Sequence, residues 1–591
     1  MKTLPKMLLM FVGIVVIISA CATVTPTKCH PPLDNASTNP NNESSRTPET
    51  SPMPEPPETS DTSHESVPDT SLDNIPDTSV PPNPEPEKET ITPPIIEPTP
   101  TPKRTIFYYQ SLLDAIKAIN KNVYTSELTN AAVSVNTETD IPHITITGVC
   151  ADYQDIVIKR DVHITLQNAI HLSGDAEITI EPNVVVTIDG KNGSITKTSD
   201  TNNSAYLFHN YGSLSLTGGY YYVATMSDDA YGIRSEGGSL YLSDATVVVS
   251  STQGRVYAVN SLHDAKLFIS RSQLSAESAK GRAITIYRAS QSLEIFGEVD
   301  IQGSTIIATS KSNGARALSL QYAQCVTLTD NHVTATSHES LYLGGEVYGL
   351  HLHSCHEAVI NGGTYIAYQT TAGAAEASAL ESNSYLIANN AAFYGYSSTV
   401  SGETYLNNCI FSGCHSGLET RNEKVVIVGG LYESPWHGGI YVCNPETYIY
   451  DATLRMTPYS KSLCYQNTKY RPHEVDGTPY EGTYYSCMYV GDPYIEAKAY
   501  IDNCTFDGLE YLTTGNAISV SSNYRYLNSA CYISNVAIDA YIRVDGLSDT
   551  NQIATLYVGA NVQYTGIHGA GNVDTETYQE QSFRYSNETR S

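Results

Sequence analysis

The stretch between residues 205 and 269 contains one pattern three times, and this repetition limits the folds open to the chain. Each copy holds a short apolar strand and then, after a turn, a second strand in which apolar and polar residues alternate. The alternating apolar residues are Leu214 and Leu216, Leu240 and Leu242, and Leu267 and Ile269. The copies are about 26 residues apart, an interval typical of repeat architectures. Because strict alternation places every second side chain on the same side, the pattern predicts short, half-buried β-strands and not helices.

A unit of this size, with two or three short strands and no crossover helix, cannot bury its apolar side alone and must stack on copies of itself. A propeller blade needs about 40 residues, and the spacing of leucine-rich repeats is absent. The pattern over 143–565 resembles the right-handed parallel β-helix of the pectate-lyase-like superfamily. The resemblance implies an all-β solenoid in which each unit forms one coil, and it implies little about activity.

Residues 1–21 have the features of a bacterial lipoprotein signal peptide. Lys2 and Lys6 precede an apolar run that is too short for a comfortable membrane span and that ends at Cys21. The ending resembles a lipobox, which implies that Cys21 becomes the lipidated N-terminus. The chain is then extracytoplasmic, anchored to the bacterial cell membrane or outer membrane. We expect 22–104, which holds most of the chain's 29 prolines, to form a disordered linker.

The folded part is predicted to begin with an N-terminal cap at 105–142. Within it, 110–120 has apolar residues at helical spacing, so we expect an amphipathic helix that covers the exposed first edge of the solenoid. The β-helix follows at 143–565 and carries an insertion at 455–486. The remaining residues, 566–591, are expected to form a C-terminal tail. Insertions in a solenoid lie on one face, often the binding face.

The charge of the chain excludes two classes of partner. Asp and Glu number 62 against 33 Lys and Arg, which gives a net charge of -29. So acidic a chain lacks the basic surface that nucleic acid or anionic lipid requires, and membrane contact is expected through the lipid anchor only. No Cys-x-x-Cys pair occurs, and His351 and His353, which alternate with leucines, are expected to face solvent. We therefore expect no metal. We also expect no cofactor and a monomeric chain.

The catalytic segments of the resembled enzymes do not occur in this sequence. Pectate lyases of this fold carry Trp-Ile-Asp-His and Arg-x-Pro-x-x-Arg, and polygalacturonases carry paired carboxylates, because inverting hydrolysis needs an acid and a base with a water between them. Only Asp228-Asp229 and His437-Gly438-Gly439 are loosely similar, and their relation along the chain differs. The sequence favours a surface protein that binds polysaccharide or another cell-surface ligand without catalysis. The alternative is a polysaccharide lyase or glycoside hydrolase with diverged motifs.

The candidate ligand site lies where the repeat tightens to an offset of about 22 residues. This offset relates Leu418 to Ile440 and Leu406 to Val428, and Ile440 then aligns with Met488. The alignment stacks aromatic and imidazole side chains along one edge beside the insertion, with a carboxylate and a guanidinium nearby: Trp436, His437, His415, Tyr484, Tyr485, Glu419 and Arg421. Aromatic faces suit sugar rings, whose hydroxyl groups pair with polar side chains. The alternative is an aromatic edge that only packs under the insertion.

Two groups of cysteines carry structural predictions. Cys464 and Cys487 bracket much of the insertion and are the candidates for a disulfide in an oxidising compartment. Cys409 and Cys504 each follow an Asn that ends a strand, where a thiol would lie inside the coil.

Overall fold

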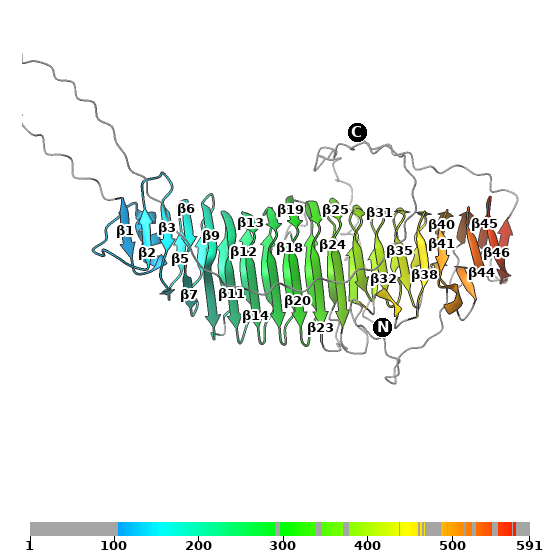
Figure 1. Cartoon of the computed structure of the whole chain (residues 1–591), viewed down its shortest axis with the longest axis horizontal. Helices are drawn as coiled ribbons and strands as arrows, with labels where there is room; N and C mark the ends of the chain where they lie inside the picture. Colours follow the sequence, from blue (N-terminus) through cyan, green and yellow to red (C-terminus); the bar gives the residue numbers. More distant parts are fainter. Residues whose placement is uncertain are drawn as a thin grey trace, which may run out of the picture. The chain divides into compact units, whose positions relative to one another are not determined.

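The computed structural model describes residues 105–574, except for 202, 290–295, 339–345, 370–376, 436–437, 459–460, 464–465, 467–485, 493, 513–514, 523–527, 546–552 and 570. The predicted signal peptide, the linker, most of the insertion and the end of the tail lie outside the described residues. The described strands form one sheet of 31 strands and one of 16 strands, in which consecutive strands of a sheet are separated in sequence (Figure 1). The predicted all-β class and the parallel β-helix are confirmed.

Most coils contribute one strand to each of three parallel ladders. In a representative coil the chain runs from Ala230–Glu236 to Ser239–Ser243 and then to Thr246–Ser251, before Val256–Leu262 begins the next coil. We call the ladder that contains Ser239–Ser243 ladder 1, the one that contains Thr246–Ser251 ladder 2, and the one that contains Ala230–Glu236 ladder 3. Ladders 1 and 2 belong to the larger sheet because two long strands pass through both of them.

Ladder 1 consists of β3 (His143–Ile146), β6 (Val162–Leu166), the first parts of β9 (Val185–Ser199) and β11 (Ser213–Thr225), β13 (Ser239–Ser243), β16 (Leu267–Ser270), β19 (Phe296–Gln302), β22 (Ala323–Thr329), β25 (Glu357–Asn361), β28 (Leu386–Asn389), β31 (Thr404–Asn407), β34 (Val425–Val428), β37 (Thr447–Tyr450), β40 (Ala497–Asp502), β43 (Ser529–Ser534), β45 (Ala554–Val558) and β47 (Asn572–Asp574). Ladder 2 consists of β4 (Cys150–Asp152), β7 (Ala169–Ser173), the second parts of β9 and β11, β14 (Thr246–Ser251), β17 (Gln273–Ser278), β20 (Thr305–Ser310), β23 (His332–Ser337), β26 (Thr364–Gln369), β29 (Ala392–Gly395), β32 (Ile410–Gly413), β35 (Leu431–Ser434), β38 (Thr453–Met456) and β41 (Thr505–Asp507). Ladder 3 consists of β5 (Ile156–Ile158), β8 (Ile178–Ile180), β10 (Ala205–Asn210), β12 (Ala230–Glu236), β15 (Val256–Leu262), β18 (Ala283–Ala289), β21 (Ala315–Gln321), β24 (Val347–His353), β27 (Ala377–Ser382), β30 (Ser397–Val400), β33 (Leu418–Arg421), β36 (Ile440–Cys443), β39 (Met488–Val490), β42 (Asn516–Ser521), β44 (Ala537–Asp545) and β46 (Gln563–His568). A short 3-10 helix, η2 (Leu509–Tyr511), follows β41. Strand β46 pairs with β44, and β47 pairs with β45, so ladders 3 and 1 extend past the predicted end at 565.

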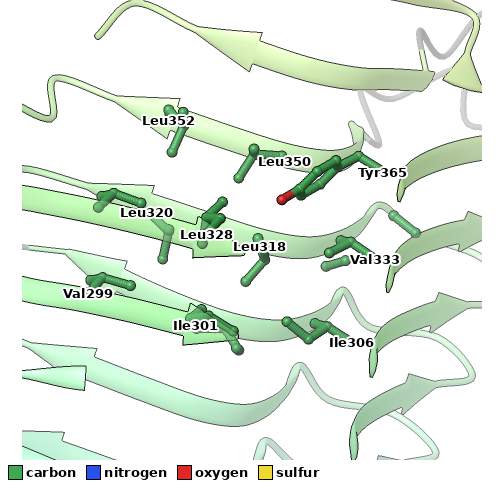
Figure 2. Packing of buried hydrophobic residues seen from close by; sticks show 14 of the residues in the cluster. Val299, Ile301, Ile306, Leu318, Leu320, Leu328, Val333, Leu350, Leu352 and Tyr365 are labelled. Atoms are coloured by element: carbon green, nitrogen blue, oxygen red, sulfur yellow. The ribbon is translucent and has the colours of Figure 1, made fainter. Parts of the chain in front are cut away.

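The interior is filled by the apolar side chains that alternate along the strands. Leu240 and Leu267 are fully buried and pair with each other across neighbouring coils, whereas Tyr241 between two such leucines is 40% exposed. Side chains from all three ladders meet inside the coils, among them Ile301 of ladder 1 and Leu318 of ladder 3 (Figure 2). The period-2 pattern therefore predicted the buried side of each strand correctly.

The N-terminal cap closes the first edge with antiparallel strands and a helix. Strand β1 (Ile106–Tyr109) pairs antiparallel with β2 (Val133–Asn136), which pairs antiparallel with β3. Helix α1 (Leu112–Lys121) begins after Ser111, whose hydroxyl accepts a hydrogen bond from the Asp114 N–H at 3.2 Å. Its buried face comprises Leu112, Ala115, Ile116 and Ile119. The predicted amphipathic helix is confirmed, one or two residues later than expected. Among the described residues, no helix is long and apolar enough to cross a membrane.

The corner between ladder 1 and ladder 2 requires a left-handed backbone. Asp244, Asn390 and Asn408 occupy this corner in three different coils with φ values of 55°, 53° and 51°. Asn and Asp tolerate this conformation better than other residues with a Cβ, which explains why they recur after ladder 1 strands. The residue that follows points inward. At two such positions the thiols of Cys409 and Cys504 are buried, as predicted.

The predicted pairing of Cys464 with Cys487 is wrong. Cys487 is a free cysteine that is fully buried, with its Sγ 3.9 Å from the carbonyl oxygen of Asp507. Burial raises the pKa of this thiol well above its usual value. Because Cys487 immediately precedes β39 and faces the interior of the coil, its side chain contributes to the core and not to the insertion; Cys464 lies outside the described residues.

The predicted offset of 22 residues is confirmed in ladder 3 and wrong at one step of ladder 1. Leu418 pairs with Ile440, and Ile440 with Met488, as the alignment required. Leu406 pairs with Ile427 and not with Val428. A shift of one residue exchanges the two faces of a strand. Ile427 is fully buried, whereas Val428 is partly exposed, so Ile427 is the residue that faces the interior.

Candidate ligand-binding surface

The structure describes three of the seven predicted site residues. His415 lies in the corner after β32, and Glu419 and Arg421 lie on β33. Trp436, His437, Tyr484 and Tyr485 lie outside the described residues. The register of β33, β36 and β39 nevertheless confirms the alignment on which the predicted stack was based.

His415 is packed against the coil that precedes it. Its ring lies 5.1 Å from the ring of Tyr396, centroid to centroid, with an angle of 20° between the planes. Its N–H donates to the Tyr396 carbonyl oxygen at 2.8 Å, and its own carbonyl accepts from the Ser434 hydroxyl at 2.7 Å. His415 is therefore fixed at this corner, half-buried, by one stacked ring and two hydrogen bonds.

Glu419 and Arg421 are paired with each other on the outer side of β33. The Arg421 Nε donates to Glu419 Oε1 at 2.8 Å, and the second guanidinium contact is 2.7 Å. The Arg421 side chain is 53% exposed, against 15% for Glu419. The pair therefore presents a guanidinium to solvent above a carboxylate that is already neutralised.

A row of polar and aromatic residues continues from Glu419 along the outer side of ladder 3. The strand register places Tyr441, Tyr489, Ser519 and Arg543 one after another, one residue per coil. We call Glu419 and these four residues the outer row. Sequence reasoning used the strands of Tyr441 and Tyr489 for alignment and missed both side chains as site residues. The sequence indicates their orientation, because each tyrosine stands between two apolar residues that face inward and must therefore face outward itself.

The two tyrosines of the outer row meet edge to face. Their ring centroids are 5.0 Å apart and their planes are at 87°. On ladder 1 the rings of Tyr448 and Tyr500 instead lie parallel, 4.7 Å apart at 13°. Parallel stacking uses the faces of both rings, whereas an edge-to-face pair uses the face of only one ring. A sugar packs on a ring face, so the outer row is the better match to the predicted chemistry.

Ionisable groups near the outer row are shifted by burial. Burial raises the pKa of Tyr441, and the neighbouring thiol of Cys443, Tyr489 and Glu419 add to the effect. Burial, with Glu419 and Asp492, likewise raises the pKa of Cys443. Both groups are therefore neutral at pH 7, and Tyr441 offers a hydroxyl and not a phenolate.

A second carboxylate close to the predicted site has a structural role. Glu433 on β35 is 1% exposed, and burial raises its pKa. Its Oε1 accepts from the Ser412 hydroxyl at 2.7 Å and from the Leu463 N–H at 2.6 Å. Arg455 contacts its other oxygen at 3.8 Å. Because Glu433 accepts from the Leu463 N–H, it links the start of the insertion to ladder 2. Because its side chain is buried, it cannot reach a substrate.

His351 lies on the outer side of β24, as predicted, but its ring is only partly exposed. It stacks on Tyr348 with centroids 5.0 Å apart, and its Nδ1 lies 3.3 Å from the Ser319 hydroxyl. Burial lowers the pKa of His351 to about 3, with the charges of Arg316 and His353 adding to the shift. Within the part of the chain that the structure describes, no group of three or more His, Cys, Asp and Glu residues is placed to hold a metal ion.

Comparison of the chain with protein-family models, with curated proteins and with solved structures found no match. The parallel β-helix is therefore identified from the strand pairing of this chain alone.

Proposed function

We propose that the protein is an extracytoplasmic, lipid-anchored β-helix that binds polysaccharide or another surface ligand, and that the outer row is part of its binding surface. The observation that carries the proposal is the register of Glu419, Tyr441, Tyr489, Ser519 and Arg543, one residue per coil on one side of ladder 3. Successive coils are about 4.8 Å apart, so the row places aromatic and polar groups at regular intervals, and Ser519, at 8% exposed, is its buried member. A polymer with a regular repeat can contact several of them at once.

The residues of the outer row favour binding over catalysis. Glu419 is neutralised by Arg421, and the nearby acid Glu433 is enclosed and bonded to a backbone N–H. Hydrolysis by inversion needs two carboxyl groups that both reach the substrate, with a water between them. The described carboxylates of this region do not offer that arrangement.

Loss of the two tyrosines should weaken retention of the ligand. We expect the double variant Tyr441→Ala and Tyr489→Ala to bind about 10-fold to 100-fold more weakly, because each aromatic contact contributes roughly 0.5–1.5 kcal/mol beyond its buried area. Trp436→Ala should have a similar effect, because the sequence alignment predicts that Trp436 lies one coil from Cys414. The measurement is affinity electrophoresis on a panel of polysaccharides, with Tyr241→Ala on ladder 1 as the matched control.

The same panel decides between binding and catalysis. Every polysaccharide that is retained is assayed for new reducing ends and for unsaturated ends, and we expect neither. Release of such ends by the parent protein would contradict the non-catalytic function. Unchanged retention by the double variant, together with a lower melting temperature, would show that the tyrosines serve packing alone.

The lipid anchor is tested separately. Cys21 lies directly at the end of the apolar run of the predicted signal peptide, where a lipobox has its lipidated cysteine, so Cys21→Ala should abolish lipidation and release the protein from membranes. The measurement is membrane fractionation with metabolic labelling by a fatty acid, and Cys29→Ala is the control. Membrane retention and labelling of the Cys21→Ala variant at the parent level would contradict a lipoprotein.

A further inference from the structure

The corner between ladder 2 and ladder 3 carries a cluster of basic residues in two consecutive coils. Arg255, Lys280 and Arg282 line a surface recess of about 440 Å³, together with Gln253, Asn313 and Asp229. We call this recess the basic corner. It is unexpected in a chain with a net charge of -29, in which acidic residues outnumber basic ones by 62 to 33.

The shape of the basic corner is set by serine and glycine residues. Ser251 accepts from the Gly254 N–H at 2.9 Å, and Ser278 accepts from the Gly281 N–H at 2.8 Å, so both coils turn in the same way. A Cβ at Gly254 would lie 2.2 Å from the backbone of Asp228, and one at Gly281 would lie 1.9 Å from the Gly254 oxygen. Only glycine fits at these two positions, and the long side chains next to them line the recess.

The charges around the recess are not balanced. Val256 pairs with Ala283, so Arg255 and Arg282 stand at the same position in neighbouring coils, about 4.8 Å apart along the backbone. Like charges directly opposite each other destabilise a sheet. The single carboxylate of the recess, Asp229, accepts from the Arg255 N–H at 2.6 Å and lies 3.5 Å from its Nε.

Several basic residues elsewhere on the solenoid are paired with carboxylates. Lys159, Lys266 and Arg271 each contact a carboxylate, at 2.8, 3.3 and 2.8 Å. In the described residues, Lys280 and Arg282 form no ion pair. Three cations thus face one carboxylate in a recess that admits a ligand, and an anion would remove the repulsion between them.

We propose that the basic corner binds oxyanion groups, carboxylate or sulfate, of an anionic glycan. Guanidinium groups form paired, charge-assisted hydrogen bonds with such groups, and the amides of Gln253 and Asn313 supply neutral donors at the rim. The patch spans few coils of a chain with a net charge of -29, which disfavours the long, dense polyanion of nucleic acid. This site goes beyond the proposed function, because it lies on other coils than the outer row and takes a ligand of defined charge.

The test compares two triple variants of the full chain. In one variant Arg255→Gln, Lys280→Gln and Arg282→Gln remove the cations of the basic corner; in the control, Lys159→Gln, Lys266→Gln and Arg271→Gln remove three paired cations. Both variants lose three positive charges. Titrations use a heparin oligosaccharide for sulfate, polygalacturonate oligomers for carboxylate, dextran as a neutral glycan and duplex DNA.

We expect the parent and the control to bind at least one anionic glycan, and the basic-corner variant to bind it about 100-fold more weakly. Added salt should weaken binding, because it screens charges on the surface. The single variant Lys280→Gln, which changes one exposed side chain, should show an intermediate loss with an unchanged melting curve. Retention of a neutral glycan through the outer row should not change.

Three results would overturn the proposal. Equal losses in the two triple variants would mean that net charge and not the recess controls binding. Failure of the parent to bind either anionic glycan would contradict the proposal that the basic corner binds this class of ligand. Duplex DNA bound as tightly as the glycans would show an unselective polyanion surface. Each of these results leaves the experiments on Tyr441 and Tyr489 unaffected, so the two functions fail independently.

Discussion

Leu242→Asp should destabilise the solenoid by at least about 3 kcal/mol, because a carboxylate would be buried without a partner. Leu242 is 2% exposed and pairs with Ile269 in the next coil. The neighbouring residue Tyr241 is 40% exposed, so Tyr241→Asp should cost little beyond its stacking on Phe268. The measurement is chemical unfolding of both variants against the parent, followed by circular dichroism.

Hydrogen exchange adds a spatial readout to this comparison. In a solenoid each coil contacts only its neighbours, so the loss of protection in Leu242→Asp should centre on β11, β13 and β16. Equal destabilisation by the two substitutions would contradict the register of ladder 1.

Gly430→Ala should also destabilise the fold by about 3 kcal/mol or more, because the new methyl group would collide with backbone. Gly430 has a φ of 90°, and an added Cβ would lie 2.2 Å from the carbonyl oxygen of Cys409 in the preceding coil. The carbonyl cannot move away easily, since it accepts from the Leu431 N–H at 2.9 Å.

Gly174→Ala is the matched control for this prediction. Gly174 has a φ of 63°, and an added Cβ would meet no atom within 4 Å. In this variant only the left-handed conformation of the new alanine is unfavourable, so the free energy of unfolding should fall by about 1 kcal/mol. Thermal unfolding of the two variants separates backbone strain from steric overlap, and similar losses in both would contradict the close packing of coils at the corner that contains Gly430.

The sequence alone determined the features that depend on near neighbours. Alternation along each strand selects its buried side, so Leu240 and Leu242 were placed inside without knowledge of the partner strand. The same holds for α1, whose start depends on Ser111 and Asp114, three residues apart. Cys409 and Cys504 could be placed inside because each directly follows a corner residue with left-handed backbone, Asn408 or Asn503. These contacts span a few residues, and propensity and steric limits settle them locally.

The tertiary structure alone decided which coils and side chains meet. Leu406 pairs with Ile427 and not with Val428, so the register of that step follows the buried side chain and not a constant repeat length. Cys487 was predicted to pair with Cys464 because the two cysteines bracket much of the insertion, but the pairing of β36 with β39 encloses Cys487 in the core. The basic corner joins Arg255 and Arg282, 27 residues apart, through a stacking that no local pattern encodes. Such contacts depend on the exact length of each coil, and a single inserted residue changes every side chain that follows.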